Sequence, residues 1–88
     1  MLFMGEVSLS HYVYILKCAD GTLYTGYSMN VTDRVKRHNA GKGAKYTRSR
    51  LPVKVVYTEE FDNRGDALSR EYAIKQMTRK QKMKLIAK

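Results

Sequence analysis

Apolar and β-branched residues concentrate in two short stretches near the start of the chain. His11–Lys17 and Leu23–Ser28 are both rich in aromatic and β-branched side chains, which favour strands. The Asp20-Gly21 pair between them is a strong hairpin signal, because glycine adopts the positive φ that tight turns require. The pattern therefore predicts an antiparallel hairpin.

A helix is predicted directly after the hairpin. Asn30 can cap a helix over Val31–Asn39, with Asp33 at the third helical position. The next stretch, Ala40–Pro52, contains glycines and basic residues without apolar periodicity, so it is predicted to be an exposed basic loop.

The second half of the chain predicts one more strand and two helices. Val53–Phe61 returns to β-branched and aromatic residues and is predicted to be a strand. Asp62 or Asn63 can then cap a helix over Arg64–Met77. A final short basic helix is predicted over Arg79–Ala87.

The predicted order is strand, strand, helix, strand, helix, helix. It suits an α+β fold in which a small three-stranded antiparallel sheet is flanked by helices. A chain of 88 residues has room for one core. We expect a single domain over residues 11–88, preceded by a flexible tail over residues 1–10.

The excess of basic residues indicates which kind of partner the protein binds. Lys and Arg number 17 against 8 Asp and Glu, which leaves a formal net charge of +9. A positive potential on so small a surface favours a polyanion, and nucleic acid is the commonest one. The alternative is a basic protein that is only soluble or ribosome-associated.

The sequence also excludes some classes of protein. Cys18 is the single cysteine, so neither an internal disulfide nor a CxxC metal site is expected. A reducing cytoplasm fits this composition. No segment reaches the roughly 18 to 20 apolar residues that a membrane span requires, so no membrane association is expected.

Tyrosines are the first candidates for chemistry. Because strand side chains alternate, Tyr12 and Tyr14 share one face of the first strand, and Val13 and Ile15 share the other. Tyr24 lies across the hairpin and can converge with Tyr14. The alternative is that these tyrosines only fill the core.

Charged residues on apolar faces are the second group. Arg34 and His38 are four residues apart, on the side of the helix that also carries Val31 and Val35. Burying such groups without partners is costly, which suggests a cleft or anion site. They could instead be boundary residues that extend outward.

Glu71 repeats this placement on the later helix. Ala67, Leu68 and Ile74 surround it at helical spacing. A carboxylate there needs a cation, which could be Arg34 in a salt bridge or a divalent metal with oxygen ligands.

The ordered set of motifs resembles the GIY-YIG nuclease family. The set comprises Tyr12-Val13-Tyr14, Tyr24-Thr25-Gly26, Arg34, His38 and Glu71, and the resemblance covers the chain from His11 onward. With its basic loop, the chain is similar to a widespread bacterial group of stand-alone GIY-YIG proteins. It also resembles the catalytic domain of a structure-specific endonuclease subunit that cuts branched DNA.

The resemblance implies a metal-dependent endonuclease that hydrolyses DNA. Tyr14 and Tyr24 would be the motif tyrosines, with Tyr24 or His38 helping to activate the attacking water. Arg34 would hold the scissile phosphate, and Glu71 would be the single protein ligand of Mg²⁺ or Mn²⁺. An unperturbed tyrosine has a pKa near 10, so the identity of the general base stays open.

Two positions depart from the family pattern. Tyr12 stands where the name-giving glycine is expected. Many members also carry an asparagine soon after the metal-binding glutamate, whereas residues 72–88 contain none, although Gln76 could substitute. These differences keep open a non-catalytic nucleic-acid-binding module, and less strongly an interaction domain of a larger repair protein.

The basic loop is the predicted contact surface for DNA, including branched or single-stranded forms. Together with the basic segment 79–84, it could follow phosphates without reading sequence. Tyr46 could stack on an unpaired base or pack within the domain. Family nucleases commonly borrow specificity from an attached domain, so a protein partner could supply it here. The predicted contact residues are Lys42, Lys45, Tyr46, Arg48 and Arg50.

Overall fold

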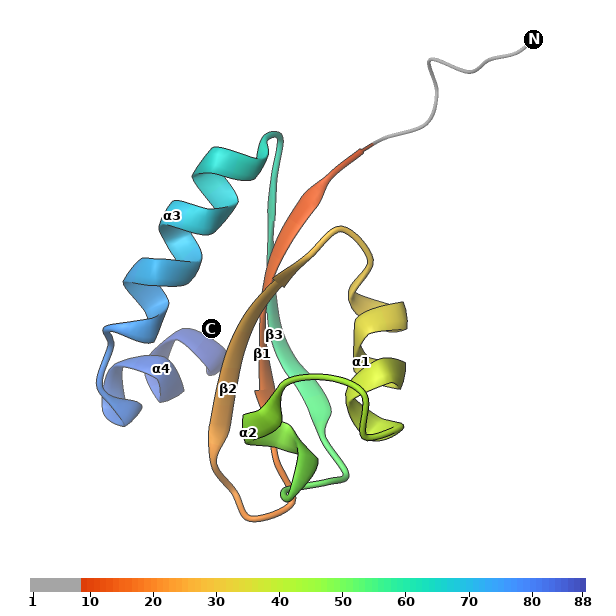
Figure 1. The fold of residues 1–88 in the computed structure, drawn as a ribbon. Coiled ribbons are helices and arrows are strands. Elements are labelled where there is room, and N and C mark those ends of the chain that lie inside the picture. Colours follow the sequence, from red (N-terminus) through yellow and green to blue (C-terminus); the bar gives the residue numbers. More distant parts are fainter. Residues whose placement is uncertain (1–8) are drawn as a thin grey trace, which may run out of the picture.

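The structure, a computed structural model, describes residues 9–88 and places a three-stranded antiparallel sheet between two pairs of helices (Figure 1). The strands are β1 (His11–Lys17), β2 (Leu23–Ser28) and β3 (Lys54–Phe61). The predicted α+β class and the hairpin are confirmed. The predicted tail falls on residues 1–8, which lie outside the described residues, and on Leu9 and Ser10.

Four helices surround the sheet: α1 (Val31–Asn39), α2 (Lys45–Arg48), α3 (Arg64–Lys75) and α4 (Arg79–Ile86). The short helix α2 corrects the prediction of a wholly irregular, exposed loop over residues 40–52. A single helical turn is too short to show apolar periodicity, and its buried residue, Thr47, is polar. The prediction missed α2 for these two reasons.

The strand order is β2-β1-β3, so β1 lies in the middle and β2 has a free edge. In the hairpin, Tyr14 lies opposite Gly26, and Leu16 lies opposite Tyr24. Opposed residues in an antiparallel pair point to the same face. Tyr14, Tyr24 and the open space at Gly26 therefore share one face of the sheet.

Each face of the sheet supports its own apolar cluster. Val13 and Ile15 pack with residues of α3 and α4, whereas Tyr14 and Leu16 pack on the opposite face with residues that include Val31 and Val35 of α1 (Figure 1). The predicted alternation along β1 is thus confirmed. Because both faces are covered, β1 is buried from Val13 to Leu16.

Side-chain amides fix the ends of the helices. Asn30 Oδ1 accepts from the Asp33 backbone N–H at 3.0 Å, which is the predicted cap. Asn39, at the end of α1, bonds both backbone groups of Val53, at 2.7 Å to its nitrogen and 3.0 Å to its oxygen. These bonds hold α1 against the segment that leads into β3.

None of the helices in the described part of the chain is long and apolar enough to cross a membrane.

Candidate active site

The candidate site begins with Tyr14, whose ring crosses Gly26 on the edge strand. A Cβ atom at Gly26 would lie 2.5 Å from both Tyr14 Cζ and Tyr14 Oη, closer than any stable contact. Only glycine leaves this space. Gly26, in the second motif, is therefore required because the ring of Tyr14, in the first motif, occupies the space that a side chain at position 26 would need.

His38 anchors the hydroxyl of Tyr14. The two residues come from α1 and β1, and both are almost fully buried. Tyr14 Oη lies 3.1 Å from His38 Nε2, and His38 Nδ1 lies 2.9 Å from Thr47 Oγ1. The imidazole thus has a partner on each nitrogen.

The hydroxyl of Thr47 sets the direction of these hydrogen bonds. Thr47 Oγ1 donates its single proton to the Ala44 carbonyl oxygen at 2.9 Å, so it can only accept from His38 Nδ1. His38 Nδ1 must then carry a proton. In the neutral imidazole, Nε2 is left as the acceptor of the Tyr14 hydroxyl proton.

The electrostatic environment supports this protonation pattern. Burial, together with the Arg34 guanidinium, lowers the pKa of His38, which keeps the imidazole neutral at neutral pH. Burial raises the pKa of Tyr14 to about 12, with further raising by Tyr24 and opposition from Arg34. The neutral phenol therefore donates to the neutral imidazole.

Gly43 and Tyr24 enclose the imidazole. A Cβ atom at Gly43 would lie 2.7 Å from His38 Cγ and 2.9 Å from His38 Cα, so the loop approaches His38 too closely for any side chain. The Tyr24 ring lies 5.3 Å from the His38 ring and 6.5 Å from the Tyr14 ring, centroid to centroid. The structure brings both predicted tyrosines together at His38.

Arg34 lies at the rim of this cluster. The prediction put Arg34 and His38 together on the core-facing side of α1, but only His38 is buried and Arg34 is exposed. Arg34 lies 60° from Val31 around the helix, at the margin of the apolar stripe. Its guanidinium donates to the Tyr27 carbonyl oxygen at 3.4 Å and interacts electrostatically with Tyr14.

Glu71 approaches the same edge from α3, on the other face of the sheet. Its side chain is 17% exposed, and Oε2 lies 3.2 Å from Lys75 Nζ. The structural cation is therefore Lys75, one helical turn away, and not Arg34. Glu71 contributes to the electrostatic environment of Tyr14, which places its carboxylate near the cluster.

The donor set at Glu71 fits Mg²⁺. In the described part of the chain, no three His, Cys, Asp or Glu side chains gather as a metal cluster. Mg²⁺ does not require one, because it commonly binds one or two carboxylates and keeps water and substrate phosphates as its other ligands. Glu71 offers one carboxylate that is partly open to solvent and lies within electrostatic range of Tyr14.

The predicted contact residues of the loop differ in their surroundings. Lys42, Lys45 and Arg48 are exposed and form no ion pair with a described residue. Arg50 pairs with Asp20 at 3.0 Å and lies 3.9 Å from the Tyr46 ring centroid. Tyr46 also stacks on the Tyr24 ring at 6.1 Å. The Tyr46 and Arg50 side chains therefore support Tyr24.

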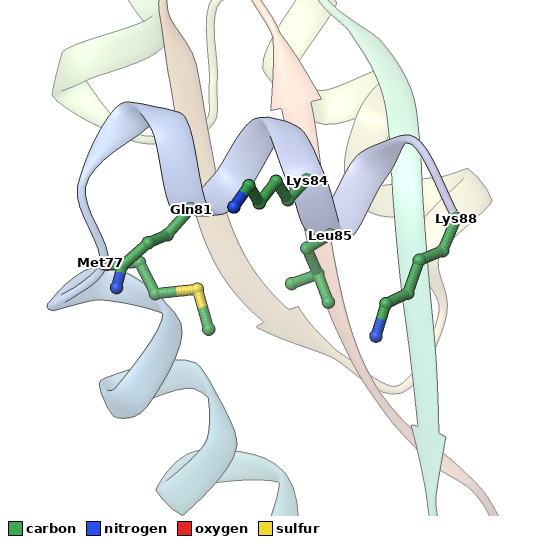
Figure 2. A pocket seen from close by; sticks show the side chains of 5 residues that line it. All are labelled: Met77, Gln81, Lys84, Leu85 and Lys88. Carbon is green, nitrogen blue, oxygen red and sulfur yellow. The ribbon is translucent and has the colours of Figure 1, made fainter.

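A second hollow lies apart from this cluster, around α4 (Figure 2). It has a volume of about 410 Å³. Its lining contains neither a carboxylate nor any predicted site residue, and consists of Met77, Gln81, Lys84, Leu85 and Lys88. It therefore offers no carboxylate side chain to a metal.

Sequence reasoning missed the roles of Thr47 and Gly43. Both lie in the segment predicted to be a loop, and neither carries a periodic signal. Their contacts with His38 arise only because the chain turns back after α1. The signal that could have found them is the glycine-rich stretch directly after His38, which allows a close return of the backbone.

Comparisons with known proteins agree on one family. The model described as "GIY-YIG catalytic domain" matches residues 10–84. A UPF0213 protein of Staphylococcus haemolyticus is 58% identical over 76 residues, covering 86% of this chain and 93% of that protein. Another, from Natronomonas pharaonis, is 54% identical over 81 residues, covering 92% and 95%.

Solved structures give the same result. The solution NMR structure of a UPF0213 protein from Bacillus halodurans aligns with a TM-score of 0.58 and 47% identity, covering 89% of this chain and 83% of that one. An E. faecalis protein, also solved by NMR, aligns with a TM-score of 0.58 and 48% identity, covering 83% and 78%.

Proposed function

Because this chain belongs to the GIY-YIG catalytic domain family, which is a nuclease superfamily, we propose that it is a divalent-metal-dependent endonuclease that hydrolyses DNA phosphodiester bonds. One observation carries the proposal: Tyr14 Oη is hydrogen-bonded to His38 Nε2, which in the neutral imidazole can only accept a proton. Arg34 and Glu71 approach the same strand edge from opposite faces of the sheet.

In the proposed mechanism, Arg34 holds the scissile phosphate. Its exposed guanidinium can reach a ligand at the rim, and a planar guanidinium matches the geometry of phosphate oxygens. Fixing the phosphate next to the attacking water supplies orientation. The same charge stabilises the pentacovalent transition state.

Tyr14 and His38 move the proton. The attacking water passes its proton to Tyr14 Oη as its oxygen bonds to phosphorus, while Tyr14 passes its own proton to His38 Nε2. The bond from phosphorus to the leaving oxygen breaks, and the leaving oxygen takes a proton from solvent. Tyr14 then does not have to form a free phenolate. Its pKa of about 12 would prevent that at neutral pH. Tyr24, against both rings, orients this pair.

Glu71 would hold Mg²⁺ or Mn²⁺, which supplies charge stabilisation to the leaving oxygen. Its carboxylate is the described acidic group that interacts with Tyr14. Lys42, Lys45, Tyr46, Arg48 and Arg50 would contact the rest of the DNA, which fits branched, damaged or single-stranded forms in repair or recombination. A cytoplasmic location and a protein partner that supplies specificity belong to the same proposal.

A non-catalytic nucleic-acid-binding module is the second candidate. It is favoured by one contact, the pairing of the Glu71 carboxylate with Lys75 at 3.2 Å, which competes with a metal. In this case the basic surface would bind DNA without cutting it.

Cleavage assays separate the two candidates. Labelled single-stranded, duplex, flap and branched DNAs would be incubated with Mg²⁺, Mn²⁺ or EDTA, using wild type, Glu71→Gln and Arg34→Ala. Cutting that requires metal and is lost in both variants supports the endonuclease. Binding without cutting by wild type under every condition supports the module.

A further inference from the structure

Another hollow, with a basic lining that includes Arg34, lies at the end of β2 and outside the Tyr14–His38 cluster. It has a volume of about 390 Å³. Residues from β2, α1 and α3 line it, so it wraps the free edge of the sheet. Its charged lining consists of three arginines and one aspartate: Arg34, Arg37, Arg64 and Asp33.

Two of these arginines lack a carboxylate partner in the described part of the chain. Neither Arg37 nor Arg64 forms an ion pair with a described residue, whereas Arg50 and Arg70 each pair with a carboxylate. Arg64 is also the first residue of α3, where the helix dipole disfavours a cation. The charge at position 64 therefore does not stabilise the helix that carries it.

Tyr27 connects this hollow to the candidate site. Its carbonyl oxygen accepts from the Arg34 guanidinium at 3.4 Å, and the Arg64 guanidinium carbon lies 5.9 Å from its ring centroid. Its hydroxyl lies 2.6 Å from His11 Nδ1, which fixes the ring. Arg34 and Arg64 thus flank one anchored residue.

We propose that this hollow is a second phosphate-binding subsite, in which Arg37 and Arg64 hold a backbone phosphate next to the one held by Arg34. This inference rests on the proposed function, because the neighbouring phosphate is the scissile one. Two arginines from separate elements can contact one phosphate from two sides. Asp33, the one carboxylate of the lining, would repel a phosphate, so the phosphate is placed at the arginine side of the hollow. The DNA strand would then cross the free edge of β2.

Binding without cleavage tests the subsite. Affinity for a labelled single-stranded DNA would be measured by fluorescence anisotropy in EDTA over a series of salt concentrations, for wild type, Arg37→Gln and Arg64→Gln. Each variant should weaken binding and reduce the steepness of log affinity against log salt by up to about 0.7, the contribution of one phosphate contact on a single strand. Lys36→Gln, on the same helix but outside this lining, is the matched control and should change the slope less.

A chemical change in the DNA locates the contact. A neutral methylphosphonate placed in turn at each phosphate should weaken wild-type binding at the subsite position. The same replacement should have a smaller effect on Arg64→Gln, because that variant has already lost one of the two arginines that hold the phosphate. A methylphosphonate effect that is equal in both proteins at every position overturns the proposal, as does an unchanged salt slope in both arginine variants.

Failure of the subsite and failure of the nuclease are distinguishable. If wild type cuts DNA but the slopes do not change, the endonuclease stands and the subsite falls. If wild type never cuts but the slopes fall as expected, the subsite stands on a binding module. Melting temperatures of the variants should match wild type, and Arg37→Gln provides the same test should Arg64→Gln fold poorly.

Discussion

Tyr14 Oη lies 3.1 Å from His38 Nε2, and the proton between them belongs to the tyrosine. This follows from Thr47, whose own proton is committed to the Ala44 carbonyl oxygen. In the proposed mechanism, this hydrogen bond lets Tyr14, whose pKa is about 12, pass its proton to a buried base. It also makes distinct predictions for pH and for substitutions.

The pH dependence of cleavage should follow His38. The pKa of His38 lies below its usual value of 6.5, so the base is deprotonated above that pH and is lost as pH falls through the lowered pKa. Plots of kcat/KM against pH should therefore rise to a plateau by neutral pH, with an apparent pKa below 6.5. A rate that keeps increasing through pH 8 to 10 would instead indicate tyrosinate as the base.

Removing the Tyr14 hydroxyl should interrupt the relay. Tyr14→Phe keeps the ring over Gly26 but leaves His38 Nε2 without its donor. We expect kcat to fall by about 10² to 10⁴, the range typical of proton-transfer groups. DNA affinity in EDTA should stay near the wild-type value. A loss of affinity with kcat unchanged would assign Tyr14 to binding.

Thr47 should act by positioning His38. Thr47→Val retains the shape of the side chain but loses the oxygen that accepts from Nδ1, so the imidazole can adopt the other tautomer. We expect a loss of about tenfold to hundredfold in kcat, as for other groups that orient a reacting residue. Thr47→Ser keeps the oxygen and should restore most of the rate. Equal losses in both variants would point to packing alone.

Lys75 should compete with the metal for Glu71. Because Lys75 Nζ lies 3.2 Å from Glu71 Oε2 and is half exposed, the pair adds little to stability. Lys75→Gln should lower the Mg²⁺ concentration needed for half-maximal cleavage by a few fold, with an unchanged melting temperature. Glu71→Gln is the control and should remove the metal dependence with the activity. An increased metal requirement in Lys75→Gln would contradict this role.

Thr25 offers a test of the core. Its Oγ1 is buried without a hydrogen-bond partner among the described residues. Thr25→Val removes the unsatisfied hydroxyl at the same volume, so we expect a gain of about 1 kcal/mol and a melting temperature about 4 to 8 °C higher. Ser28→Ala is the control, because Ser28 Oγ bonds both backbone groups of Asn30 and its loss should destabilise. A lower melting temperature for Thr25→Val would mean that the hydroxyl is satisfied.

The sheet could be predicted because its signals are local. Alternation in His11–Lys17, the Asp20-Gly21 turn and the Asn30 cap each act within a few residues, and the structure confirms all three. What could not be predicted is how side chains from opposite faces of the sheet meet at the edge of β2.

The surroundings of individual site residues depend on tertiary contacts. Arg34 is exposed because it lies at the margin of the apolar stripe of α1, where spacing alone does not fix burial. Glu71 pairs with Lys75 within its own helix, a choice that periodicity left open. Thr47 escaped attention because a single buried hydroxyl in a one-turn helix gives no pattern.

The most direct test is single-turnover cleavage of a labelled branched DNA with Mg²⁺, comparing wild type with Tyr14→Phe and Glu71→Gln proteins purified side by side. We expect wild type to cut this DNA and both substitutions to reduce the cutting at least about a hundredfold, while all three proteins melt at similar temperatures. Equal cutting by all three would show a contaminating nuclease, and the absence of cutting by wild type on every DNA and metal tried would contradict the catalytic account.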